Sequence, residues 1–106
     1  LDDALLQFNE FICENSASGP GMVQVWGNGA TFDNVLLRNS YEKTMIACPW
    51  RYRNDRDVRT IVELGKAVGC TPRYEIPFEG AEHNALDDAL HQIKYVSIIW
   101  QKLTKN

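Results

Sequence analysis

The feature that most constrains the fold is a single convincing β-strand, Met-Val-Gln-Val-Trp at residues 22–26, which the turn Gly27-Asn28-Gly29 ends. Its β-branched and aromatic residues are typical of a short buried strand. The segments on either side have helical patterning, yet a lone strand is not viable, because its backbone N–H and C=O groups need neighbouring strands. We therefore expect further strands from a segment before Leu1 or from a partner chain. We interpret the chain as an interior piece of a longer polypeptide.

Four helices are predicted around this strand. Apolar residues recur near a helical period over residues 1–13, from about 31 to 42, over 57–68 and from about 84 to 103. Gly69 is expected to end the third helix, and two proline-containing stretches, 44–56 and 71–82, are expected to be loops. The alternation of helix, strand and helix predicts an α/β fold. The last helix is predicted to carry one broad apolar stripe, which consists of Leu86, Leu90, Ile93, Val96, Ile99 and Trp100.

Composition excludes several classes of protein. The 106 residues have a net charge of −3, which argues against binding nucleic acid through bulk positive charge. It does not exclude an enzyme that meets phosphate through a carboxylate-bound metal ion. No apolar run approaches the roughly 18–20 residues of a membrane span, so no membrane partner is expected. Because Cys13, Cys48 and Cys70 support neither a disulfide framework nor a zinc site, we expect a cytoplasmic protein.

Two groups of acidic residues point to chemistry. Asp33 follows the strand at the start of a helix, and the segment from His83 to Asp88 opens the last helix. Carboxylates from two elements can share a hard divalent cation, and a nearby histidine can accept a proton from water. Taken separately, each group also has a structural interpretation: Asp33 can favour a helix N-terminus through the helix dipole, and Asn84 can cap the last helix.

The two groups together resemble the DEDDh 3′–5′ exonucleases. The segment Ala30-Thr31-Phe32-Asp33 matches the A-x-F-D part of that family's middle motif, and His83-x4-Asp88 matches its last motif. Within that family, the sequence most resembles the phage and bacterial branch of exodeoxyribonuclease VIII-type, RNase T-like enzymes. The resemblance covers nearly the whole chain. It implies that residues 1–106 are the C-terminal portion of an RNase H-like exonuclease domain whose N-terminal strands are missing.

The resemblance also implies residue roles. Asp33 and Asp88 would bind Mg²⁺ or Mn²⁺ in a two-metal site, and His83 would be the general base that deprotonates the attacking water. Asp57 is a family feature that we interpret as structural, as the N-cap of the helix that follows it. Contacts to the 3′-terminal nucleotide are implied for Asn28, Gly29, Ala30 and Phe32.

The sequence departs from the family at its first motif, the DxE pair. Asp2 and Asp3 are poor substitutes, because they lie on the helix before the strand. Two carboxylates alone should bind Mg²⁺ poorly, since the ion then keeps most of its waters. The expected function is therefore that of a fragment of a metal-dependent 3′–5′ exonuclease acting on the 3′ end of DNA or RNA, with the fragment inactive alone.

Two alternatives remain open: a catalytically dead nucleic-acid-binding or assembly module with the same fold, and a structural fragment whose acids are only helix caps. The exonuclease hypothesis predicts that the Asp33 and Asp88 carboxylates lie within about 4–7 Å of each other. Exposed sheet edges would make a homo-oligomer possible.

Aromatic and basic residues give weaker indications. Trp26 and Trp100 are predicted to be core residues. A cluster of arginines interleaved with an aromatic residue could contact phosphate or form a solvated loop. That cluster is Arg51, Tyr52, Arg53, Arg56 and Arg59.

Overall fold

The computed structural model describes residues 1–105, which form a mixed α/β structure that is mostly helical. Within these residues the strands form one small parallel sheet of two strands. The chain divides into two compact units, the first spanning Leu1–Asp57 and the second beginning at Val58. No helix of the described residues has the length and apolar character needed to cross a membrane.

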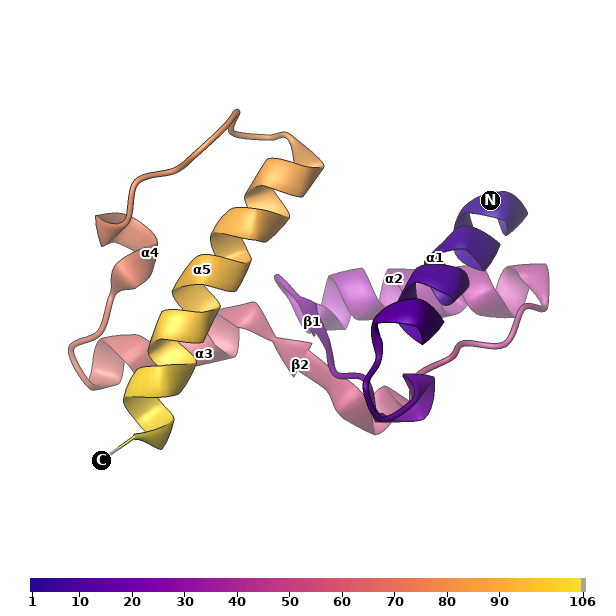
Figure 1. The fold of residues 1–106 in the computed structure, drawn as a ribbon, viewed down its shortest axis with the longest axis horizontal. Coiled ribbons are helices and arrows are strands. Elements are labelled where there is room, and N and C mark those ends of the chain that lie inside the picture. The colour runs from indigo at the N-terminus through magenta and orange to yellow at the C-terminus, as the bar shows by residue number, and fades with distance from the viewer. Residues whose placement is uncertain (106) are drawn as a thin grey trace. The chain divides into compact units, whose positions relative to one another are not determined.

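The first unit contains a strand–helix–strand arrangement (Figure 1). The strands pair in parallel, with Val25 opposite Asp55 and Gly27 opposite Asp57. Because parallel neighbours need a crossover connection, the helix between them forms part of that connection. Single 3-10 turns, Pro20–Met22 and Tyr52–Asn54, precede the strands. The elements of this unit are α1 (Asp2–Asn15), β1 (Val25–Gly27), α2 (Ala30–Thr44) and β2 (Asp55–Asp57).

The sequence-based prediction of one strand at residues 22–26 was wrong in two respects. The strand β1 begins later and includes Gly27, and a second strand, β2, follows α2. Glycine is required at residue 27 of β1, because a Cβ atom at this position would overlap the Oδ1 atom of Asn34. The pattern missed β2 because its three residues, Asp-Arg-Asp, are all charged and are stabilised by contacts from other elements.

Among the charged residues of β2, Asp55 shows most clearly how contacts from other elements stabilise the strand. Its carboxylate accepts hydrogen bonds from Nη2 of Arg38, at 2.9 Å to each oxygen, and from Nε1 of Trp50 at 2.8 Å. Burial raises the pKa of Asp55, but hydrogen bonds from Trp50, Asn34 and Arg38, together with the positive charge of Arg38, lower it below its ordinary value. The Arg38 guanidinium also lies 5.6 Å from the centre of the Trp50 ring.

The core of the first unit lies between α1, α2 and the segment before β2. Trp50 makes edge-on contacts with Phe8 of α1 and Tyr41 of α2, with ring centres 6.1 and 5.8 Å apart. The Tyr41 hydroxyl donates a hydrogen bond to Oδ1 of Asn9 at 2.5 Å, which satisfies its buried polar group. The buried apolar residues of this core are Leu5, Ile12, Tyr41 and Trp50.

The second unit consists of α3 (Val58–Ala67), α4 (Pro72–Glu75) and α5 (Ala85–Thr104), with α3 and α4 both packed against α5. Gly65 is required where α3 meets α5, because a Cβ atom there would lie 3.2 Å from the Ile99 side chain and 2.6 Å from the Cys70 carbonyl oxygen. Gly69 follows α3 at a φ of 74°, as expected for the residue that ends a helix. The helix α4 was missed within the predicted loop at 71–82.

The predicted apolar stripe of α5 is mostly exposed. Ile99 is buried, but the other fully buried residue of this helix is Tyr95 rather than a member of the predicted stripe. Trp100, predicted to be a core residue, is 51% exposed, while Trp26 is half-buried. The helices α3 and α4 pack against α5, whose buried residues Tyr95 and Ile99 are four residues apart and therefore lie on one face. The exposed members of the predicted stripe are Leu86, Leu90, Ile93 and Trp100.

Candidate active site

Asp33 lies in the first turn of α2, directly after the turn that ends β1. Its Oδ2 atom accepts a hydrogen bond from the backbone N–H of Asn28 at 3.1 Å. The N-cap of α2 is Gly29, whose φ of 98° lies in the left-handed region that glycine adopts without strain. The structure therefore brings Asp33 together with the turn that contains Asn28, Gly29 and Ala30.

Asp57 completes this end of α2. Its Oδ1 atom accepts hydrogen bonds from the backbone N–H groups of Gly29 and Ala30, each at 3.1 Å. These are among the first N–H groups of the helix, which have no partner within the helix. Since Gly29 has no side chain to cap them, Asp57 supplies the acceptor from the neighbouring strand. Sequence reasoning predicted that Asp57 caps the helix after it, and it missed this bond to a segment 27 and 28 residues earlier.

The residues predicted to contact the terminal nucleotide all lie in this region. The backbone N–H groups of Asn28, Gly29 and Ala30 are engaged by the carboxylates of Asp33 and Asp57. The Phe32 side chain, in contrast, is 68% exposed. A stacking contact from this ring is therefore compatible with the structure, whereas the three backbone donors are already used within the unit.

His83 and Asp88 lie together at the start of α5. The backbone N–H of His83 donates to Oδ1 of Asp88 at 3.3 Å, and the His83 side chain is exposed. Asn84 caps the helix as predicted, since its Oδ1 accepts the N–H of Asp87 at 3.1 Å. His83 adopts a φ of 70°, which is uncommon for a residue with a side chain.

Asp87 holds the loop that leads into His83. Its Oδ2 accepts the backbone N–H of Ala81 at 3.0 Å, and Asn84 donates its N–H to the Ala81 carbonyl at 3.1 Å. Gly80 has a φ of 97°, and a Cβ atom at this position would lie 2.5 Å from the Asp87 carboxylate. The loop therefore requires glycine at residue 80, a feature that the sequence prediction did not include.

The predicted metal ligands suit a hard cation in their chemistry. Within the described residues, Asp33 and Asp88 each use one carboxylate oxygen in the bonds above and keep the second for a further ligand. Oxygen donors of this kind are those that Mg²⁺ and Mn²⁺ prefer. Within neither unit, over residues 1–105, do three His, Cys, Asp or Glu side chains gather as a metal-binding group.

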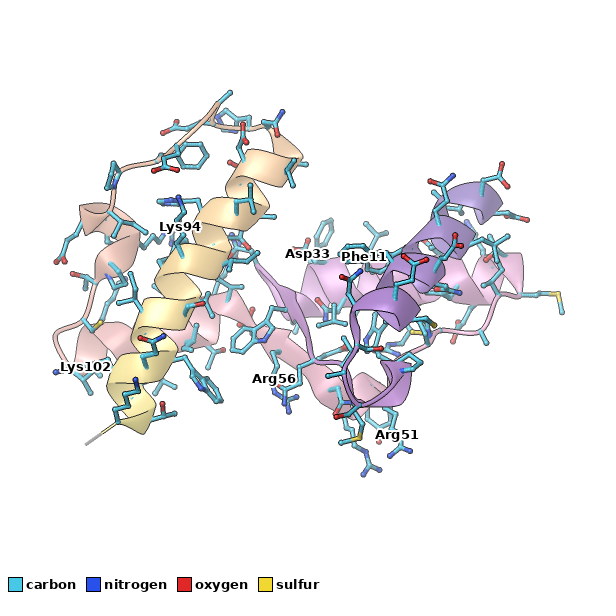
Figure 2. The ribbon with its side chains drawn as sticks, in the orientation of Figure 1. Phe11, Asp33, Arg51, Arg56, Lys94 and Lys102 are labelled. Atoms are coloured by element: carbon cyan, nitrogen blue, oxygen red, sulfur yellow. The ribbon has the colours of Figure 1, made fainter. Side chains whose placement is uncertain are left out.

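Two members of the arginine cluster, Arg51 and Arg56, lie away from Asp33 within the first unit (Figure 2). Arg51 and Arg53 are exposed beside the 3-10 turn that precedes β2, whereas Asp57 and the N-terminus of α2 lie at the other end of that strand. Arg56 donates to the backbone carbonyls of Arg53 and Asp55 at 2.8 and 3.0 Å. Part of the cluster therefore stabilises its own loop.

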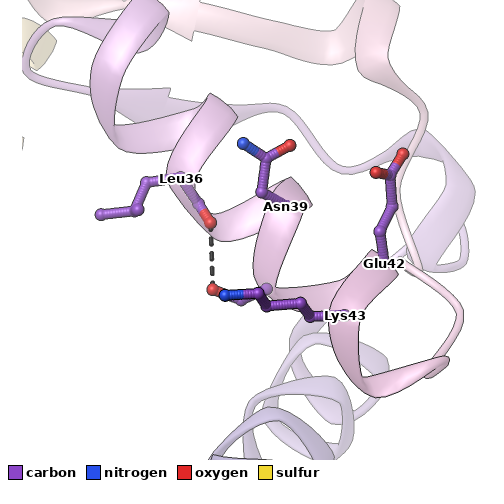
Figure 3. A pocket seen from close by; sticks show the side chains of 5 residues that line it. Leu36, Asn39, Glu42 and Lys43 are labelled. Atoms are coloured by element: carbon purple, nitrogen blue, oxygen red, sulfur yellow. Dashed lines mark hydrogen bonds between the residues drawn. The ribbon is translucent and has the colours of Figure 1, made fainter.

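A hollow of about 570 Å³ lies over α2 (Figure 3). All of its lining residues belong to this one helix, so it is a depression in the surface rather than an enclosed cavity. It contains none of the predicted site residues. Its lining consists of Leu36, Asn39, Ser40, Glu42 and Lys43.

Comparison with known proteins identifies the family. Residues 1–100 match the family model described as the 3′–5′ exoribonuclease Rv2179c-like domain. No curated protein and no solved structure matched the chain. The match supports a 3′–5′ exonuclease, a hydrolase of nucleic acids. The chain belongs to the family of 3′–5′ exoribonuclease Rv2179c-like domains.

Proposed function

We propose that this chain forms part of a metal-dependent 3′–5′ exoribonuclease of the DEDDh type, with an RNase H-like fold. The observation that carries the assignment of roles is the pairing of His83 with Asp88 at the start of α5, at the spacing of the H-x4-D motif. Family membership supports RNA rather than DNA as the substrate.

Asp33 and Asp88 are the residues that would hold Mg²⁺ or Mn²⁺. The ions, when bound, would supply a more acidic water and would stabilise negative charge on the attacking and leaving oxygens. The hydrogen bonds from Asn28 to Asp33 and from His83 to Asp88 limit the rotation of each carboxylate. Each side chain is thereby held before a ligand binds, which reduces the ordering that binding requires.

His83 would accept the proton from the attacking water. Its ring is exposed, and its backbone is fixed by bonds to Asp88 and by the loop that Asp87 holds. Histidine is the residue that most often acts as a general base in enzymes. The exposed Phe32 ring would pack against the base of the 3′-terminal nucleotide.

The site requires more carboxylates than this chain supplies. Mg²⁺ bound by one or two carboxylates keeps several waters and is held weakly. We propose that two further carboxylates complete a two-metal site, and that the 106-residue chain alone is inactive. In this proposal, Asp33, His83 and Asp88 of this chain form one part of the site, and the rest of a longer polypeptide supplies the other carboxylates.

The test is a nuclease assay on single-stranded RNA labelled at its 5′ end, with Mg²⁺ or Mn²⁺. The proteins compared are the longer polypeptide, its Asp88→Ala variant and the 106-residue chain. The proposal predicts progressive shortening from the 3′ end by the longer polypeptide, and none by the other two. Glu10→Ala is the matched control, because it removes an exposed carboxylate of α1 outside the site.

Other outcomes contradict the proposal. Shortening by the 106-residue chain would show that no further carboxylates are needed. Binding of RNA without cleavage by the longer polypeptide would instead favour a catalytically dead binding module. Labelled DNA of the same sequence, assayed in parallel, tests the choice of RNA: equal or faster cleavage of DNA would contradict it.

A further inference from the structure

The N-terminus of α2 is held by a residue that belongs to another strand. Asp57 is the last residue of β2 and lies opposite Gly27, the last residue of β1. From there its carboxylate accepts the N–H groups of Gly29 and Ala30. The bonds are partly buried, which limits the competition from water for these donors.

Asp33 depends on the same turn. Its carboxylate accepts the N–H of Asn28, the residue directly before the two that Asp57 holds. The backbone N–H groups of Phe32 and Asp33 in turn donate to the Gly29 carbonyl, each at 2.9 Å. The direction of the Asp33 carboxylate is therefore determined by a turn of three residues, and Asp57 fixes two of them to the sheet.

We propose that Asp57 is a positioning residue for Asp33, acting through the backbone of residues 28–30. This inference rests on the proposed function, in which Asp33 binds a metal ion. In this scheme Asp57 acts through its Oδ1 atom, which accepts both backbone donors. Residues that orient a metal ligand through hydrogen bonds affect metal affinity without contacting the ion.

The test uses Mn²⁺ alone as the probe. Mn²⁺ is paramagnetic and broadens the NMR signals of nearby nuclei, so the signals of Asn28 and Asp33 report binding at Asp33 in the longer polypeptide, which supplies the further carboxylates. The wild-type longer polypeptide is compared with its Asp57→Ala variant, which lacks the acceptor, and with its Asp57→Asn variant, which lacks the charge but keeps an amide oxygen. Hydrogen exchange of the Gly29 and Ala30 amides in each protein reports whether the two bonds are present.

The expected result separates position from charge. In Asp57→Ala the Gly29 and Ala30 amides lose protection, and Mn²⁺ affinity at Asp33 falls by about 10-fold. In Asp57→Asn protection is largely kept, and the affinity is rescued toward the wild-type value. Ile12→Val, a cavity-forming change in the core of the same unit, controls for stability and leaves the affinity unchanged.

Three results would overturn the inference, and they are distinguishable. Unchanged Mn²⁺ affinity in Asp57→Ala, with the amide protection lost, would show a purely structural role. An equal loss of affinity in Asp57→Asn and Asp57→Ala would show that only the charge matters. If the wild-type longer polypeptide shows no broadening at Asp33, the proposed function fails, and the inference fails with it.

Discussion

Replacing Asp55 by Ala is expected to destabilise the first unit strongly. The side chain lies at the start of β2 and accepts hydrogen bonds from Arg38 and Trp50. Its removal leaves the Arg38 charge and the Trp50 indole N–H without their partner in a partly buried position. The free energy of unfolding therefore falls for two reasons: the hydrogen bonds are lost, and their donors are left unpaired.

The magnitude follows from burial. Removing one partner of a buried ion pair costs about 3–5 kcal/mol. The Arg38 and Asp55 side chains are 25% and 23% exposed, so water partly replaces the lost bonds. We expect a loss of about 2–3 kcal/mol in the free energy of unfolding, which is below the value for a buried pair because both side chains are partly exposed.

Hydrogen exchange of amides within α2 measures this free energy for the first unit separately from the second. Glu10→Ala, which removes an exposed carboxylate of α1, should leave it nearly unchanged. In the double variant of Asp55→Ala and Arg38→Ala the loss should be smaller than the sum of the single losses, because the unpaired charge is then absent. A loss below about 0.5 kcal/mol in Asp55→Ala, the scale of an ordinary surface substitution, would refute the reasoning.

Three further predictions concern pH, packing and substrate. Because the pKa of Asp55 is lower in the folded chain, its ionised carboxylate stabilises the fold above the ordinary carboxyl pKa, about 4, and this stabilisation is lost as the pH falls through the lower folded value. The free energy of unfolding, measured in a series of acidic buffers, should therefore fall less steeply with decreasing pH in Asp55→Asn. An unchanged dependence on pH would contradict the assignment. Gly65→Ala should destabilise the second unit by about 1–3 kcal/mol in urea unfolding, since the added Cβ meets Cys70 and Ile99, and a gain in stability would contradict this packing. Phe32→Ala should leave the melting temperature unchanged, because the ring is 68% exposed, while raising the KM for RNA in the longer polypeptide; an unchanged KM would exclude the ring from the substrate contact.

Local signals in the sequence predicted the start of α5 well. Asn84 precedes the helix and reaches the Asp87 N–H only three residues along the chain, so a short pattern is enough to identify the cap. The same applies to Gly69, whose left-handed conformation follows from its place after α3. Residues that begin or end a helix through contacts over three or four positions can therefore be identified from the neighbouring sequence.

Features that depend on distant contacts could not be predicted in the same way. The β2 strand consists of charged residues that become suitable for a sheet only because Arg38, Trp50 and the N-terminus of α2 satisfy Asp55 and Asp57. The buried face of α5 could not be identified in this way, because periodicity alone does not show which side of the helix α3 and α4 cover.

The candidate site combines both kinds of information. Asp33, His83 and Asp88 were identified from motif spacing, and their roles stay predictions. The supporting contacts, from Asp57 to the turn before Asp33 and from Asp87 to the loop before His83, were visible only in the structure. In each of these contacts a carboxylate accepts a backbone N–H group, and a backbone donor leaves no pattern of side chains in the sequence.

The measurement that tests the central claim most directly is a crystal structure of the longer polypeptide with Mn²⁺, located by its anomalous scattering. We predict Mn²⁺ ligated by carboxylate oxygens of both Asp33 and Asp88, with these two carboxylates about 4–7 Å apart. Mn²⁺ bound to only one of the two residues, or carboxylates too far apart to share a two-metal site, would contradict the account.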